Sequence, residues 1–338
     1  MSWSLKIFNK FPINLSSSIH ARAFNSKAIG ILGVPFDKGA GTRGTDKGPN
    51  ALREAGLIDE IKHISSNIDV KDYGDVHYEL MNTNGRKIHN LNDLSDVAAC
   101  NKALADKVES IIKDNRMPIT LGGCHSIAIG SISGVLRTTT PDKLCILWVD
   151  AHLDLNTNTT SPTGNMHGMP ASLLVKELRS NWPTIPELEW CKADLSLRNF
   201  CWIGLRSIDY YERIMMEQYG IKYFDMRDID RMGIDKVTNA ALKAINPNGD
   251  RQLHVSFDID SLDPLFANAT GTPAGAGLTL RECLFLMEEV HRSGTLSSMD
   301  LVEVNPLVGD TRDVTNTLNS AKAIVCAAIG SNRSGNST

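Results

Sequence analysis

The 338-residue sequence is informative first for what it has little of. It contains no run of about 18 apolar residues, the length that a membrane-spanning helix needs, so no membrane partner is expected. Neither sign of charge dominates, because the formal net charge is only −4, and nothing suggests a nucleic-acid partner. The seven cysteines are scattered and form no Cys-x-x-Cys pair, which argues against a disulfide framework and against a zinc ribbon.

Acidic residues are missing from the N-terminal segment, where the first carboxylate is that of Asp37. Residues 1–24 instead carry Lys6, Lys10 and Arg22 among apolar residues and serines. This composition is typical of an organelle transit peptide. We therefore predict that residues 1–24 are a mitochondrial transit peptide and that the protein acts in the mitochondrial matrix. A ragged N-terminus on a cytoplasmic protein is the alternative.

Short apolar segments alternate with segments of helical periodicity along the rest of the chain. The strands are expected at residues 28–34, 117–121, 144–149, 200–205, 253–257 and 299–304, and the clearest helices at 96–113, 236–245 and 279–292. The strand segments are nearly continuous hydrophobic runs, which is typical of strands covered on both faces. The pattern predicts an α/β fold with a mainly parallel sheet between helices. No linker divides the chain, so residues 25–338 are expected to form a single domain.

Polar side chains gather where the predicted strands end. The clusters are Gly122-Gly-Cys-His125, Asp150-Ala-His-Leu-Asp154, Ser207-Ile-Asp209, Asp258-Ile-Asp260 and Glu303. A parallel sheet places ligand sites in the crevice beyond the carboxyl ends of its strands. A single aspartate at a strand end is most often a helix cap or a turn residue. Five clusters at five strand ends, however, predict that these residues converge on one crevice.

The clusters hold enough ligands for more than one metal ion. Two imidazoles and four carboxylates are available, from His125, Asp150, His152, Asp154, Asp258 and Asp260. In an extended segment, positions i, i+2 and i+4 face the same way, so each cluster could face one point. Six ligands are too many for one tetrahedral zinc, but they suit two divalent ions that share carboxylates. A set dominated by oxygen, with some imidazole, favours Mn²⁺, with Co²⁺, Fe²⁺ or Ni²⁺ as alternatives.

The motifs as a set resemble those of the ureohydrolase (arginase/agmatinase) family, and most closely those of its arginases. The similarity runs in order from about Ile29 to Ile329. The segments that carry it are Gly33-Val-Pro-Phe36, Gly122-Gly-Cys-His-Ser126, Asp150-Ala-His-Leu-Asp154, Thr163-Gly-Asn-Met-His-Gly168, Ser256-Phe-Asp-Ile-Asp-Ser-Leu-Asp-Pro264, Gly271-Thr-Pro273 and Glu303-Val-Asn-Pro306.

The resemblance implies a fold, a reaction and an assembly. The fold would be a three-layer α-β-α sandwich with about eight strands. Arginases hydrolyse L-arginine to L-ornithine and urea with a hydroxide that bridges two manganese ions, which would make this chain a metal-dependent enzyme of arginine metabolism and the urea cycle. Plain water attacks a resonance-stabilised guanidinium poorly, whereas two metals can lower the pKa of a bridging water from about 15.7 towards neutrality. A homotrimer with two Mn²⁺ per subunit is expected.

The resemblance also assigns roles to individual residues. The six metal ligands would be those named above, and Asp154 would also orient the hydroxide. His167 would be the proton shuttle, and Glu303 would pair with the guanidinium group of the substrate. The remaining substrate contacts divide between the α-carboxylate (Asn156, Thr163 and Asn165), the α-amino group (Asp209 and Glu212) and the wall of the site (Thr272).

Three positions depart from the pattern of the family. Ser207 stands where the first aspartate of a D-x-D pair is usual, which removes a negative charge near the substrate α-ammonium. Cys124 replaces the aspartate of G-G-D-H beside a presumed metal ligand, where it could loosen His125; a thiolate ligand is the less favoured reading. Ala276 occupies a position where glycine is common, and the sequence alone offers no physical account of this change.

Three other functions compete with this interpretation. An agmatinase or another ureohydrolase for guanidino substrates would give Asn156 and Asn165 less to bind, because its substrate lacks the α-carboxylate or the α-amino group. A zinc deacetylase of similar architecture would need only one metal ion. A metal-free scaffold would have no use for the intact ligand set.

Ser207 gives the first testable prediction. We expect the substitution Ser207→Asp to lower the KM for L-arginine with little change in kcat, because it restores a negative charge near the substrate α-ammonium. Steady-state kinetics of urea release from L-arginine measures both constants. An unchanged KM would show that position 207 does not influence arginine binding.

Overall fold

One sheet of eight strands organises the part of the chain that the structure describes. This computed structural model describes residues 28–80, 87–331 and 333, so the predicted leader at residues 1–24 lies outside it. The strands are β1 (Ala28–Gly33), β2 (Asp69–Asp75), β3 (Met117–Leu121), β4 (Leu144–Val149), β5 (Phe200–Leu205), β6 (Tyr223–Asp225), β7 (Gln252–Asp258) and β8 (Leu296–Val302). Their order across the sheet is β2-β1-β3-β8-β7-β4-β5-β6, and every neighbouring pair is parallel.

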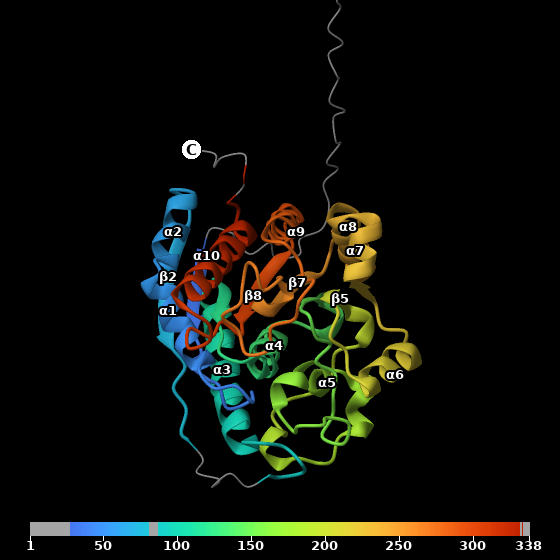
Figure 1. Cartoon of the computed structure of the whole chain (residues 1–338). Helices are drawn as coiled ribbons and strands as arrows, with labels where there is room; N and C mark the ends of the chain where they lie inside the picture. Colours follow the sequence, from blue (N-terminus) through green and yellow to red (C-terminus); the bar gives the residue numbers. More distant parts are fainter. Residues whose placement is uncertain (1–27, 81–86, 332, 334–338) are drawn as a thin grey trace, which may run out of the picture.

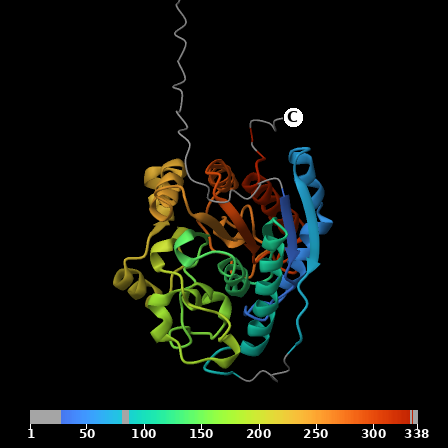
Figure 2. The ribbon, with the colours of Figure 1, turned by 180° about the vertical axis from the view of Figure 1, so that it is seen from behind.

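Helices cover both faces of this sheet (Figures 1 and 2). They are α1 (Gly48–Glu54), α2 (Leu57–Ile64), α3 (Leu94–Lys113), α4 (Ala128–Leu136), α5 (Pro170–Leu174), α6 (Tyr210–Tyr219), α7 (Met226–Met232), α8 (Ile234–Ile245), α9 (Leu280–Arg292) and α10 (Thr311–Ala328). Within residues 28–80 and 87–331, no helix has the length and apolarity needed to cross a membrane.

Two hydrophobic cores lie on opposite faces of the sheet. Side chains alternate between them along β4: Ile146 and Trp148 join the core under α3, α4 and α5, whereas Leu147 and Val149 join the core under α8, α9 and α10. Because both faces are buried, the strand reads as a continuous hydrophobic run, as the sequence predicts. The three-layer α-β-α arrangement is confirmed.

The two outermost strands were not expected from the sequence. β2 is a charged segment, Asp69-Val-Lys-Asp-Tyr-Gly-Asp75, and β6 has only three residues. Both lie at sheet edges, where one side of the strand faces solvent and charged side chains are tolerated. The hydrophobic pattern that identifies a central strand is therefore absent from them.

The strand predicted at residues 299–304 is displaced towards the C-terminus relative to β8, which spans Leu296–Val302. β8 ends at Val302 because the next residue, Glu303, has a left-handed backbone with φ 64°. The other five central strands and the three helices lie within two residues of their expected bounds. In α9, Thr279 and Glu282 form the capping box that the sequence suggests.

A backbone constraint explains why glycine suits position 276. Ala276 has φ 58°, in the left-handed region, where the Cβ atom of an L-residue is crowded by the backbone and costs about 1–2 kcal/mol. Glycine carries no Cβ and adopts this region freely. The alanine therefore strains an exposed turn between Gly275 and Gly277, a turn that follows the predicted site residue Thr272.

Candidate metal centre and substrate pocket

The predicted site residues come together at the carboxyl edge of the sheet. His125 opens a short 3-10 helix, η2 (His125–Ile127), just after β3, and Asp150 directly follows β4. Asp258 is the last residue of β7, and Asp260 lies in the following 3-10 turn, η8 (Ile259–Ser261). Because β3, β8, β7 and β4 are consecutive across the sheet, their ends deliver these side chains to one place.

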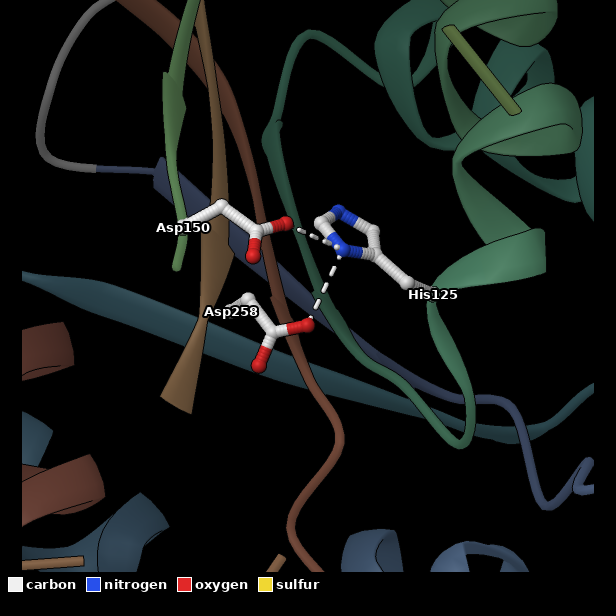
Figure 3. A group of neighbouring side chains, drawn as sticks. All are labelled: His125, Asp150 and Asp258. Atoms are coloured by element: carbon white, nitrogen blue, oxygen red, sulfur yellow. Dashed lines mark hydrogen bonds and ion pairs between the residues drawn. The ribbon is translucent and has the colours of Figure 1, made fainter. Parts of the chain in front are cut away.

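A first group of ligand atoms surrounds His125. Its Nδ1 atom lies 3.0 Å from Asp258 Oδ2 and 3.1 Å from Oδ2 of both Asp150 and Asp154. Figure 3 shows the Asp150 and Asp258 carboxylates pointing at this ring nitrogen from two neighbouring strands. His125, Asp150 and Asp258 are close enough to share a metal ion.

A second group forms around His152 and shares one residue with the first. His152 Nδ1 lies 3.1 Å from Asp260 Oδ2 and 3.4 Å from Asp150 Oδ1. Asp150 thus presents Oδ2 to the first group and Oδ1 to the second. A carboxylate arranged in this way can bridge two cations.

The extended segments that the sequence reasoning assumed are not present. Residues 150–154 follow β4 as a bend and a loop, and Asp154 has φ 56°. Asp260 follows Asp258 through the 3-10 turn, where the Asp258 carboxylate accepts a hydrogen bond from the Asp260 backbone N–H. The side chains converge because the backbone turns at the strand ends, so the expectation based on strand alternation was wrong in its geometry.

The charges of this cluster are not balanced by the protein. Asp150, Asp154, Asp258 and Asp260 are all buried, and no lysine or arginine of the described chain makes an ion pair with them. Burial and the repulsion from Asp260 and Asp150 raise the pKa of Asp258, and burial with the charge of Asp150 raises that of Asp154 to about 6. Divalent cations would relieve this repulsion, so the donor set fits a pair of metal ions.

The histidines respond to the same excess of negative charge. Burial alone would lower the pKa of each ring, but the surrounding carboxylates raise that of His125 well above its ordinary value and that of His152 to about 12. The surrounding carboxylates thus favour positive charge at these two positions. Metal ions and protons compete for these nitrogen atoms, because a coordinating imidazole must be neutral.

Several residues that hold the ligands in place were missed by the sequence reasoning. Ser256 Oγ lies 2.8 Å from His125 Nε2, and the Trp148 ring stacks on the His125 ring while its Nε1–H donates to Asp150 Oδ2. Arg206 donates to the backbone carbonyls of Asp260 and Ala274, which ties the ligand turn to the Thr272 loop. Ser256 was detectable as a lone hydroxyl within an apolar strand.

Cys124 takes no part in either ligand group. Its Sγ lies 3.1 Å from Ser126 Oγ in a fully buried position. Burial and the charge of Glu303 raise the pKa of the thiol to about 12, so it stays protonated at neutral pH. The preceding Gly123 has no room for a side chain, because a Cβ there would lie 1.8 Å from the Phe36 carbonyl oxygen.

Glu303 and His167 form a pair beside the first ligand group. Glu303 Oε1 lies 3.2 Å from His167 Nδ1 and accepts a hydrogen bond from the backbone N–H of His125. Glu303 Oε2 is buried and has no hydrogen-bond partner in the described chain. Although burial opposes the charged form, the hydrogen bond to Glu303 raises the pKa of His167.

A cavity of about 210 Å³ opens over the ligand cluster. All six predicted substrate contacts line it, as do five of the six predicted metal ligands and His167, whereas Asp150 and Glu303 are buried and are not among the lining residues. The lining residues are His125, His152, Asp154, Asn156, Ser161, Pro162, Thr163, Asn165, His167, Gly168, Ser207, Asp209, Glu212, Asp258, Asp260 and Thr272.

Two of the predicted substrate contacts also begin a helix. Asp209 is the N-cap of α6, and Glu212 accepts hydrogen bonds from the backbone N–H groups of Asp209 and Leu155. Asn156 Nδ2 donates to Asp209 Oδ2 at 2.8 Å, and Thr272 Oγ1 donates to Asp260 Oδ2 at 3.1 Å. Burial raises the pKa of Glu212 to about 8. The sequence reasoning missed this capping role.

Comparison with known proteins finds one matching family and similar relatives. A model of the arginase family matches residues 27–330. Arginase-1 of Sus scrofa is 45% identical over 315 residues, which cover 93% of this chain and 96% of that protein. The arginase of Bacillus caldovelox has a similar structure, with a TM-score of 0.82 and 33% identity over 91% of this chain and 99% of that one. The arginase of Bacillus cereus has a TM-score of 0.80 and 37% identity over 90% of this chain and 99% of that one.

Asp150 gives a prediction about metal binding. Because its two oxygens serve both ligand groups, Asp150→Asn should weaken both metal positions at once. We expect the bound metal, measured by elemental analysis after loading with Mn²⁺ and removal of free ions, to fall below one ion per chain. Mn²⁺ raises the melting temperature to the extent that it binds the folded protein in preference to the unfolded chain. This rise should therefore be smaller in the variant.

Asp263→Asn is the matched control. Asp263 belongs to the same sequence motif, but its carboxylate accepts backbone N–H groups of Leu265 and Gly277 and joins neither ligand group. Metal content should be retained in this variant. Equal metal content and affinity in Asp150→Asn and the unmodified protein would contradict the shared role of Asp150.

Proposed function

The chain belongs to the arginase family, and on this premise we propose that it hydrolyses L-arginine to L-ornithine and urea with two bound manganese ions. One observation carries the proposal: a single cavity joins a two-group cluster of carboxylates and imidazoles to a wall of amide and hydroxyl groups. A cation-binding centre at one end and hydrogen-bond donors at the other suit a long substrate with a guanidinium group and a carboxylate.

The metal ions would be held by the six residues that the sequence suggests. His125 with Asp154 and His152 with Asp260 would serve one position each, and Asp150 and Asp258 complete the set. Oxygen atoms dominate this set and no thiolate joins it, which favours Mn²⁺ over zinc. When bound, two such ions lower the pKa of a shared water and supply hydroxide at neutral pH.

The residues around the cavity would bind the two ends of the substrate. Asn156, Thr163 and Asn165 carry N–H or O–H groups that can donate to the α-carboxylate. Asp209 and Glu212 supply carboxylates for the α-ammonium group. Holding both charged groups of the amino acid would fix the distance at which its guanidinium carbon reaches the metal end.

His167 would donate a proton near the guanidinium group, and Glu303 would accept a hydrogen bond from it. Glu303 fixes Nδ1 of His167 by a hydrogen bond, and no described residue hydrogen-bonds to the other ring nitrogen. The raised pKa of His167 favours the protonated ring, which can donate to a leaving amine. The buried, unpartnered Oε2 of Glu303 offers an acceptor for a guanidinium N–H.

We further propose a mitochondrial enzyme that assembles as a homotrimer and serves the urea cycle and arginine metabolism. The acid-free, basic composition of residues 1–24 supports the location, with the cytoplasm as the alternative. The resemblance to arginases supports the trimer. Imaging of the full-length protein fused to a fluorescent reporter, and light scattering of the metal-loaded protein, test these two points.

The decisive experiment compares two substrates. We expect the Mn²⁺-loaded protein to release urea from L-arginine with a kcat/KM at least about 100-fold above that for agmatine, because agmatine leaves the carboxylate wall unpaired. Chelation should abolish the activity, and Mn²⁺ should restore it. A preference for agmatine would identify an agmatinase. If neither substrate releases urea, the proposed function is wrong.

Glu212 gives a prediction about pH. Its pKa of about 8 means that the side chain is mostly neutral at pH 7 and ionises as the pH rises. The carboxylate attracts the substrate α-ammonium more strongly than the neutral acid does, so the KM for L-arginine should fall about fivefold between pH 7 and 8.5. Glu212→Gln, which cannot ionise, should show a flat KM over this range. The same fall in both proteins would exclude Glu212 as its source.

A further inference from the structure

A short segment before α3 is tied to the loop that forms the carboxylate wall. Asn90 Nδ2 donates to the Asn158 carbonyl at 2.9 Å, and Asn158 Nδ2 donates to the His89 carbonyl at 3.1 Å. The Asn92 backbone N–H donates to the Gly164 carbonyl at 2.9 Å. These bonds join positions that are about 70 residues apart in the sequence, so residues 87–92 act as a support for residues 158–165.

The side chain of Asn92 reaches further, to a residue of the cavity wall. Its Nδ2 donates to the backbone carbonyl of Thr163 at 3.3 Å and to Oδ1 of Asn165 at 2.6 Å. A backbone carbonyl can only accept a hydrogen bond, which fixes Nδ2 of Asn92 on this side. Asn165 must therefore turn its oxygen towards Asn92.

This orientation decides which group Asn165 can offer to a ligand. With Oδ1 engaged by Asn92, the Nδ2 amino group faces away from it, beside Gly41, and no described residue accepts a hydrogen bond from it. A carboxylate accepts hydrogen bonds and donates none when ionised. The Asn165 amide is thus preset as a donor for an anionic group in the cavity.

We propose that Asn92 is a positioning residue for substrate recognition, which sets the amide of Asn165 so that the cavity favours a substrate carrying an α-carboxylate. This inference rests on the proposed arginine-hydrolysing function, since it names a specificity determinant of the same site. Asn92 itself does not line the cavity and acts only through Asn165.

The backbone around Asn92 is held in an uncommon conformation. His89, Asn90 and Asp93 have φ values of 52°, 65° and 47°, in the left-handed region that non-glycine residues rarely adopt. Arg43 Nη2 donates to Asp93 Oδ2 at 2.9 Å, which anchors the end of the segment. The segment is held against the loop by the hydrogen bonds of Asn90 and Asn92 and by the Arg43–Asp93 pair.

The test is the near-isosteric substitution Asn92→Asp. The new carboxylate can only accept, so the Asn165 amide should turn over, donate Nδ2 to it and present Oδ1 to the cavity. We expect the KM for L-arginine to rise about 10- to 100-fold through the loss of a charge-assisted hydrogen bond, with kcat changed less than about threefold. Asn92→Ala, which leaves Asn165 free to rotate, should show a smaller rise.

Asn90→Asp is the matched control, because it adds the same charge to the same segment and removes a bond to the loop backbone without touching Asn165. Its KM should stay within about threefold of the unmodified protein. For agmatine, which has no carboxylate, the kcat/KM or the inhibition constant against arginine should be equal in Asn92→Asp and the unmodified protein.

The outcomes separate this inference from the proposed function. An equal rise of KM in Asn92→Asp and Asn90→Asp, or an equal loss for arginine and agmatine, would overturn the positioning role. If the unmodified protein releases no urea from L-arginine, the proposed function fails instead. Calorimetric binding of L-arginine and agmatine to the metal-loaded proteins then gives the same comparison without turnover.

Discussion

This structure depends on one constraint: four aspartates are buried together, and no lysine or arginine of the described residues forms an ion pair with them. Taking such charges out of water costs several kcal/mol each unless something compensates them. His125 and His152 can offset part of this negative charge only in their protonated form. The neighbouring carboxylates accordingly raise the pKa of His125. A fold that accepts this arrangement is built for cations that are supplied from outside the chain.

The parallel sheet holds these aspartates in fixed positions relative to one another. Its strands are rigid and covered on both faces by packed helices, so their carboxyl ends are fixed relative to one another. The ligands lie at or shortly after those ends, from Asp258, the last residue of β7, to Asp154, five residues after β4, and the sheet therefore fixes where they start. Contacts such as Trp148 with Asp150, and Ser256 with His125, then remove the remaining rotational freedom.

The proposed substrate contacts lie instead on loops that support one another. Asn156, Thr163 and Asn165 lie in a loop rather than in a strand, and the side-chain amide of Asn165 is hydrogen-bonded by a separate segment through Asn92. Asp209 and Glu212 combine two tasks, because the carboxylates that face the cavity also begin α6. The metal end of the cavity is thus fixed by the sheet and the specificity end by hydrogen-bonded side chains.

The sequence by itself determined the central strands, the α/β class and the cluster of carboxylates and imidazoles after the strands, because these are local patterns, whereas the substrate contacts followed only from the family resemblance. It missed β2 and β6, since edge strands need no hydrophobic run. Only the tertiary structure decided how the ligands meet, through turned backbone at Asp154 and Glu303, and how Asp150 serves two groups. It alone joined Asn92 to Asn165, because a hydrogen bond between distant segments leaves no periodic trace in a single chain.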